Sequence, residues 1–149
     1  MKSKRFEPIR NIAANSAQEL QQAMIVAERH VAELEAQLAQ LQSFREDYLQ
    51  KAAQADGPMD TVRLQNNRAF LERIAEALRL QRQKLGAAHA EFEARRATWR
   101  AKHIEAEALG QAVERFRKDE RQAAERRDQR DSDEAGLRVW LAAQSGRDR

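Results

Sequence analysis

One short stretch, residues 54–60, is where this chain must turn. Gly57 can take the left-handed backbone conformation that ends a helix, and Pro58 after it suits the start of the next helix. Asp60 can cap that next helix. On both sides the residues are rich in Ala, Leu, Gln, Glu, Lys and Arg and recur with helical periodicity. The sequence therefore predicts two long helices folded back on each other about this tip.

Apolar residues recur along the first helical run at alternating steps of four and three residues, the spacing of a coiled-coil seam. The stripe continues without a miss as far as Leu41. Beyond Leu41 it slips by one residue, since Phe44 and Tyr48 continue it in place of Arg45. The seam positions are Ala13, Ala17, Leu20, Met24, Ala27, Val31, Leu34, Leu38 and Leu41.

The second helical run carries the same stripe over a longer distance. It is mostly apolar, and its polar members lower stability while fixing how the helices align. The seam positions are Leu64, Asn67, Leu71, Ile74, Leu78, Gln81, Leu85, Ala88, Phe92, Arg95, Trp99, Lys102, Ala106, Leu109, Val113, Phe116, Glu120 and Ala123.

Folding about the tip also predicts which seam residues meet. Leu34 should lie near Leu78 and Gln81, and Ala13 near Lys102. The first helical run then ends opposite residue 106, and the second run should extend beyond that point. An isolated helix with an apolar stripe is marginally stable, so this overhang is expected to bind a partner. Its uncovered seam residues would be Leu109, Val113 and Phe116.

These patterns predict an all-α fold: a long antiparallel two-helix coiled-coil hairpin with a longer second helix and a flexible C-terminal tail. The expected boundaries are 9–53 for the first helix, 54–60 for the tip and 61–131 for the second helix, within one elongated domain over residues 1–149. Residues 1–8 are expected to fray, with Pro8 near the start of the helix. Residues 132–149 are the expected tail.

The composition agrees with a rod rather than a globular domain, since 34% of the residues are charged and 5% are aromatic. The net charge of +3 is a weak argument for nucleic acid as a partner. Cysteine is absent, which excludes disulfides and thiol chemistry. No apolar run approaches the ~20 residues of a membrane span, and no secretory signal is present, so we expect a soluble, cytoplasmic protein.

No catalytic, metal or cofactor site can be assembled from these residues. His30, His89 and His103 are far apart in the sequence, and no metal-ligand spacing occurs. The glycines form no phosphate-binding loop. The Arg-rich residues 115–130 are the one candidate for nucleic-acid binding, but acidic residues interrupt them and they contain a single aromatic residue. We expect neither an enzyme nor a nucleic-acid-binding protein.

Several short segments spread over the chain form a further pattern, and none of them is specific by itself. They are Arg5-Phe6-Glu7-Pro8-Ile9, Glu35-Ala36-Gln37-Leu38, Phe44 to Tyr48, Phe70-Leu71, Trp99-Arg100-Ala101-Lys102, Asp128-Gln129-Arg130 and Asp133-Glu134. In this combination and order, the whole chain resembles the FliJ family of flagellar type III export proteins, which are antiparallel two-helix coiled coils of about this length.

This resemblance implies a stalk that links a hexameric export ATPase of the FliI type to an export gate of the FlhA type, and an escort for export chaperones. Such a protein would sit at the inner face of the cell membrane at the flagellar base and would support motility and chemotaxis. The family's gate-binding pattern falls on Gln37, Leu41, Phe44, Tyr48, Phe70, Ile74, Ala77 and Gln81. Phe44 stands where an aromatic hydroxyl is common, and Gln81 where a histidine can occur. Coiled-coil packing is the stronger interpretation for Leu41 and Ile74.

The predicted overhang suggests the surface that enters the ATPase ring, because its charges can steer docking. Its members would be Leu109, Val113, Phe116, Arg117 and Arg121. A second copy of the chain could pack there instead, as a weak homo-oligomer. Two other functions stay open from sequence: the equivalent stalk of a virulence secretion system, and a generic coiled coil associated with nucleic acid.

Overall fold

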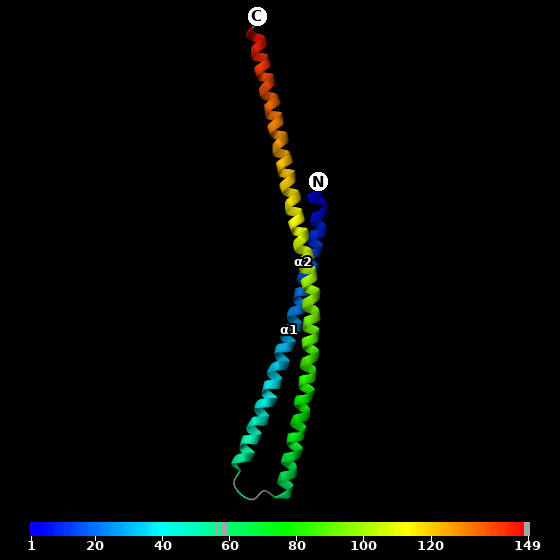
Figure 1. The fold of residues 1–149 in the computed structure, drawn as a ribbon, viewed down its shortest axis with the longest axis vertical. Helices are drawn as coiled ribbons and strands as arrows, with labels where there is room; N and C mark the ends of the chain where they lie inside the picture. The colour runs from blue at the N-terminus through cyan, green and yellow to red at the C-terminus, as the bar shows by residue number, and fades with distance from the viewer. Residues whose placement is uncertain (56, 58–59, 148–149) are drawn as a thin grey trace. The chain divides into compact units, whose positions relative to one another are not determined.

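The computed structural model describes residues 1–55, 57 and 60–147. These residues form two helices, α1 (Lys2–Gln54) and α2 (Thr61–Arg147), and no strand (Figure 1). The predicted all-α hairpin with a longer second helix is therefore confirmed. The chain divides into two compact units, which we call the hairpin unit (residues 17–101) and the terminal unit (residues 1–16 and 102–149).

The turn follows the prediction at the residues that the structure describes. Gly57 has a φ of +113°, a conformation that residues with a side chain rarely adopt. Asp60 caps α2, because its Oδ1 accepts a hydrogen bond from the backbone amide of Arg63 at 2.7 Å. Its carbonyl accepts a second one from the amide of Leu64 at 3.0 Å. Pro58 lies outside the described residues.

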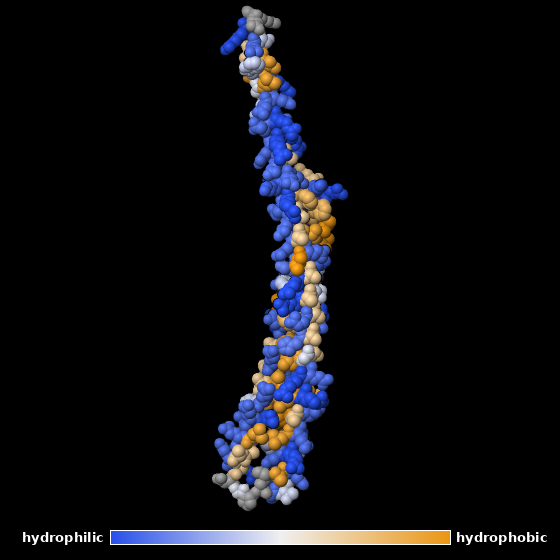
Figure 2. Space-filling view, viewed as in Figure 1, coloured by the Kyte–Doolittle hydropathy of each residue, from blue (hydrophilic) through white to orange (hydrophobic). Residues whose placement is uncertain are grey.

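In the hairpin unit the two predicted seams pack against each other over most of their length, but the predicted seam residues Leu64 and Arg95 of α2 are exposed. Val31 and Leu34 of α1 form a buried cluster with Ala88 of α2, and Leu85 and Phe92 pack against it. Figure 2 shows apolar side chains between the two helices in the part of this unit next to the turn. Burial of these side chains is what stabilises the helices, since propensity alone holds long isolated helices only marginally.

Gln81 sets the alignment of the helices in this unit. Its side chain is buried, and its Nε2 donates one hydrogen bond to the carbonyl of Leu34 at 3.1 Å and one to Oε1 of Gln37 at 2.9 Å. The predicted meeting of Leu34 and Gln81 is thus confirmed. A buried amide needs partners, so a shift of one helix along the other would break both hydrogen bonds.

In the terminal unit α1 reaches much further along α2 than predicted. Ser3, one of the residues predicted to fray, contacts Glu120. Val113 is fully buried. Further contacts join the Phe6 and Phe116 rings, 5.2 Å apart at their centroids, and Arg117 with Glu7 at 2.8 Å.

The prediction of an uncovered overhang from residue 106 is therefore wrong. One physical reason is that α1 begins at Lys2 rather than near Ile9, with Pro8 inside the helix. Proline in a helix interior removes a backbone hydrogen bond and is costly. Here the contacts of Ser3, Phe6 and Glu7 with α2 hold the first turns in the helical conformation.

The second helix also continues past its predicted end. It runs to Arg147, so residues 132–147 are helical rather than a tail of irregular structure. All residues from 121 to 147 are exposed, because α1 packs against α2 only as far as Glu120. Neither helix is long and apolar enough, over the residues described, to cross a membrane.

Candidate protein-binding surfaces

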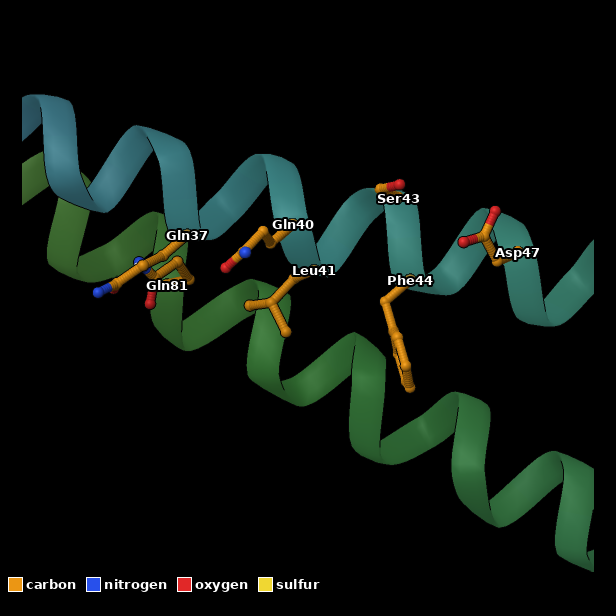
Figure 3. Close-up of a pocket in the computed structure, with 7 residues that line it drawn as sticks. All are labelled: Gln37, Gln40, Leu41, Ser43, Phe44, Asp47 and Gln81. Atoms are coloured by element: carbon orange, nitrogen blue, oxygen red, sulfur yellow. The ribbon is translucent and has the colours of Figure 1, made fainter.

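A groove runs along the hairpin unit between α1 and α2, with a volume of about 580 Å³. Figure 3 shows Leu41 and Phe44 pointing from α1 toward α2, while Gln37 and Gln81 meet at one end. The groove thus combines two apolar side chains with polar side chains around them. Its lining residues are Gln37, Gln40, Leu41, Ser43, Phe44, Asp47 and Gln81.

Phe44 is the exposed member of an aromatic cluster. It is 57% exposed, and its ring centroid lies 6.0 Å from that of Phe70. The Phe70 ring also lies 4.2 Å from that of Tyr48. The Tyr48 hydroxyl donates a hydrogen bond to Oδ1 of Asn67, which ties the cluster to α2. Phe44 therefore packs beside Phe70 while more than half of its surface stays open to a partner.

The eight residues predicted to bind the gate fall into three groups. Gln37 and Phe44 are exposed, and Gln37 lies at the rim of the groove. Leu41, Tyr48, Phe70 and Ala77 are half-buried. Ile74 and Gln81 are buried. The packing interpretation thus fits Ile74, and the hydrogen bonds of Gln81 point inward to α1.

Sequence reasoning missed Gln40, Ser43 and Asp47, which line the groove beside the predicted residues. Their steps of three and four residues place them along one side of α1, next to Leu41 and Phe44. That spacing could have identified these three residues from the sequence. A second groove of about 450 Å³ was also missed, and it is lined by Arg45, Leu64, Asn67, Arg68, Leu71, Glu72 and Ala75.

The residues predicted to enter the ATPase ring lie in the terminal unit, where most of them serve packing. Val113 is fully buried, and Leu109 and Phe116 are half-buried. Arg117 bonds Glu7 at 2.8 Å and Glu114 at 3.0 Å. Of the five, Arg121 alone is exposed. The premise that these residues form an uncovered stripe is wrong, and any contact with a ring stays a prediction.

One carboxylate in this unit has a shifted pKa. The pKa of Glu120 is lowered, first by the hydrogen bond from the Ser3 hydroxyl and then by the one from the Ser3 backbone amide. Both donors favour the charged carboxylate. In its ionised form, Glu120 therefore holds the first turn of α1 against α2.

The model of the family described as the flagellar FliJ protein matches residues 1–145. The chain belongs to the FliJ family. Its function is thus related to flagellar protein export. The comparisons with curated proteins and with solved structures gave no match. The family match covers the whole hairpin unit, with both grooves described above, and the terminal unit as far as residue 145.

FliJ proteins are export components and are not known as enzymes. In this member, the residues that the structure describes contain no group of three or more His, Cys, Asp or Glu side chains that could hold a metal ion. His89 lies 3.5 Å from Glu35, and His103 lies 3.1 Å from Glu107. Each of these pairs joins exposed side chains on helix surfaces.

Proposed function

We propose that this FliJ-family chain is a non-enzymatic stalk that links the flagellar export ATPase ring to the cytoplasmic domain of the export gate. It also escorts export chaperones, acts at the inner face of the membrane, and is needed for flagellum assembly and motility. The observation that carries the proposal is the open groove with Phe44 at its edge, in the region that the family resemblance assigns to gate binding.

The groove has the features of a protein-binding site. An exposed phenylalanine and a half-buried leucine are surrounded by Gln37, Ser43 and Asp47, which can form hydrogen bonds at the rim. Interfaces commonly combine a buried aromatic anchor with a polar rim. Gate binding would bury Phe44 and leave the hydrogen bonds of Gln81 intact, since these point inward.

Replacing Phe44 by alanine tests this role. Loss of an aromatic anchor typically weakens binding by about 2 kcal/mol, roughly 30-fold. Binding to the isolated cytoplasmic domain of the gate can be measured by calorimetry. Leu80→Ala is the matched control, because Leu80 is 44% exposed in the same unit but does not line the groove. Equal binding by F44A and the unmodified chain would remove the gate contact from this groove.

Single replacement of Phe44 is preferable to replacing the whole aromatic cluster. Tyr48 and Phe70 are half-buried and contact each other across the hairpin. Their loss would weaken the hairpin as well as any interface, so a combined variant would not separate the two effects.

In the terminal unit, the residues suited to meet an ATPase ring are the exposed ones. Arg121 is exposed, whereas Val113 and Phe116 act by keeping α1 against α2. Reversal of the charge in Arg121→Glu should lower stimulation of the ATPase without loss of helicity. Val139→Glu, at another exposed position of α2, is the control. Unchanged stimulation by R121E would argue against ring contact through this residue.

The remaining alternatives can be separated by simple observations. The family match favours a flagellar system over a virulence secretion system, and an adjacent flagellar ATPase gene would support it. Retention on immobilised DNA at about 0.3 M salt would instead favour a nucleic-acid role, since phosphate contacts weaken steeply with salt.

A further inference from the structure

The coiled-coil seam of α2 does not end where α1 ends. In the terminal unit it passes through Val113, Phe116 and Glu120, and Glu120 contacts Ser3 at the start of α1. At the same steps of four and three it continues through Ala123, Arg127, Arg130, Glu134, Leu137 and Leu141. We call residues 123–141 the free seam. The segment is helical, and every residue in it is exposed.

The free seam carries an apolar patch at its far end. Leu137 is 56% exposed, Trp140 56% and Leu141 51%. Figure 2 shows apolar atoms there, near the C-terminal end of α2. A solitary helix gains little stability without a partner, and exposed apolar side chains in a row mark a surface that binds one.

The charges and side-chain sizes along the free seam are complementary to those of a second copy that runs in the opposite direction. When a second copy lies antiparallel with the two-fold axis at Ser132, each Leu141 meets the small side chain of Ala123 in the other copy. Each Arg130 meets Glu134 of the other copy, and this ion pair forms twice because the interface is isologous. Among the residues that the structure describes, Arg130 makes no ion pair within its own chain, whereas Glu134 lies 3.9 Å from Arg138 at an exposed site.

The remaining positions are compatible with this pairing. Leu137 lies opposite the aliphatic stem of Arg127, which can cover apolar surface while its charge stays in water. Beside the seam, Arg126 of one copy falls next to Trp140 of the other, where a cation–π contact can form. A parallel pair would instead place Arg130 against Arg130 and Glu134 against Glu134 in the seam, so the charges within the seam favour the antiparallel arrangement.

We propose that residues 123–141 of α2 form an antiparallel coiled coil with the same segment of a second copy of this chain. The pairing ends near residue 143, because beyond that point α1 of the second copy already covers its own seam at Glu120. About 19 residues per copy span only about 28 Å of helix. Such an interface is small, so we expect a reversible dimer with a dissociation constant on the order of 100 µM.

This inference goes beyond the proposed function, and it does not require the gate or the ATPase. The dimer would cover the exposed end of α2 that a monomer keeps free. Two like-charged pairs lie beside the seam near the two-fold axis. Asp131 falls next to Asp131 of the other copy, and Asp133 next to Asp133 of the other copy. Their repulsion keeps the association weak.

Sedimentation equilibrium of the full chain tests the dimer over about 10 to 500 µM, a range that brackets the expected dissociation constant. The unmodified chain should pass from monomer to dimer. Leu137→Asp should remain monomeric, since it places a charge in the seam. Val139→Asp is the control, because Val139 is 71% exposed and lies on the side of α2 away from the seam.

Exchanging the charges of Arg130 and Glu134 tests the direction of the pairing. This test does not depend on the apolar patch. Arg130→Glu should weaken association by about tenfold or more, because the new carboxylate would face Glu134 of the other copy. The double variant Arg130→Glu with Glu134→Arg should restore association, because opposite charges again meet across the two-fold axis. Asp133→Asn should strengthen it.

Three results would overturn the proposal. The chain could remain monomeric over the whole range. V139D could dissociate the dimer as fully as L137D, which would indicate nonspecific association. The double exchange could fail to restore a dimer that R130E had lost. If the chain stays monomeric and the ATPase, added without other partners, protects the free seam from a protease, this surface would be assigned to the ring instead.

Discussion

The hydroxyl and the backbone amide of Ser3 both donate hydrogen bonds to the carboxylate of Glu120, at 2.6 and 3.1 Å. The two residues are 117 positions apart in the sequence. This pair joins the first turn of α1 to α2 and gives the amide of Ser3, which has no partner within the helix, an acceptor. The start of α1 therefore depends on the charge of one side chain in the other helix.

The Glu120 pair predicts a loss of structure in acid. Because the pKa of Glu120 is lowered in the folded chain, its contribution to stability is complete above the ordinary value of 4.5 and is lost as the pH falls through the folded pKa. Chemical shifts of the Ser3 and Phe6 amides should follow that titration. In Ser3→Ala the transition should move toward the ordinary glutamate range, since the hydrogen bond from the Ser3 hydroxyl, the largest cause of the lowered pKa, is gone. A titration of α1 that S3A leaves unchanged would contradict this account.

Val113 is predicted to be the most sensitive apolar position of the terminal unit. Its side chain is fully buried, and removing two methyl groups from such a site lowers the free energy of unfolding by about 1 to 3 kcal/mol. Urea denaturation of Val113→Ala followed by circular dichroism gives the measurement. Val139→Ala, on an exposed site of the same helix, should change stability by less than about 0.5 kcal/mol.

Gln81 is predicted to contribute through its two hydrogen bonds. Replacement by alanine removes both and leaves a gap in the seam, which should lower the free energy of unfolding by about 2 kcal/mol. Gln83→Ala, at an exposed position two residues away, is the control. If Q81A and Q83A unfold at the same urea concentration, the buried amide does not hold the alignment.

Two glycines should respond to alanine in opposite directions. Gly57→Ala should destabilise the chain by about 1 kcal/mol, because a φ of +113° is unfavourable for any residue with a Cβ even where the space is open. Gly86 lies inside α2, and a Cβ there meets nothing within 4 Å. Gly86→Ala should therefore stabilise the chain by about 0.5 to 1 kcal/mol. Thermal unfolding of the two variants, compared under the same conditions, measures both shifts.

Local periodicity was enough to predict that two helices form and which side of α1 packs against α2. All nine seam positions of α1 from Ala13 to Leu41 are at least half-buried, because steps of four and three keep side chains on one side of a helix whatever lies opposite. The cap by Asp60 and the backbone of Gly57 were equally local. The family resemblance was confirmed as well, since it follows from residues spread over the whole chain.

Contacts between distant residues decided the rest. The alignment of the terminal unit depends on Ser3 meeting Glu120 and on Phe6 meeting Phe116, and these contacts make the first residues helical despite Pro8. Seam spacing repeats every seven residues, so several alignments of the two helices satisfy the same sequence pattern. Only the summed packing and hydrogen bonding of the folded chain selects one. For the same physical reason the sequence marked Val113 and Phe116 as seam residues, while only the tertiary structure decided that α1, rather than a partner, covers them.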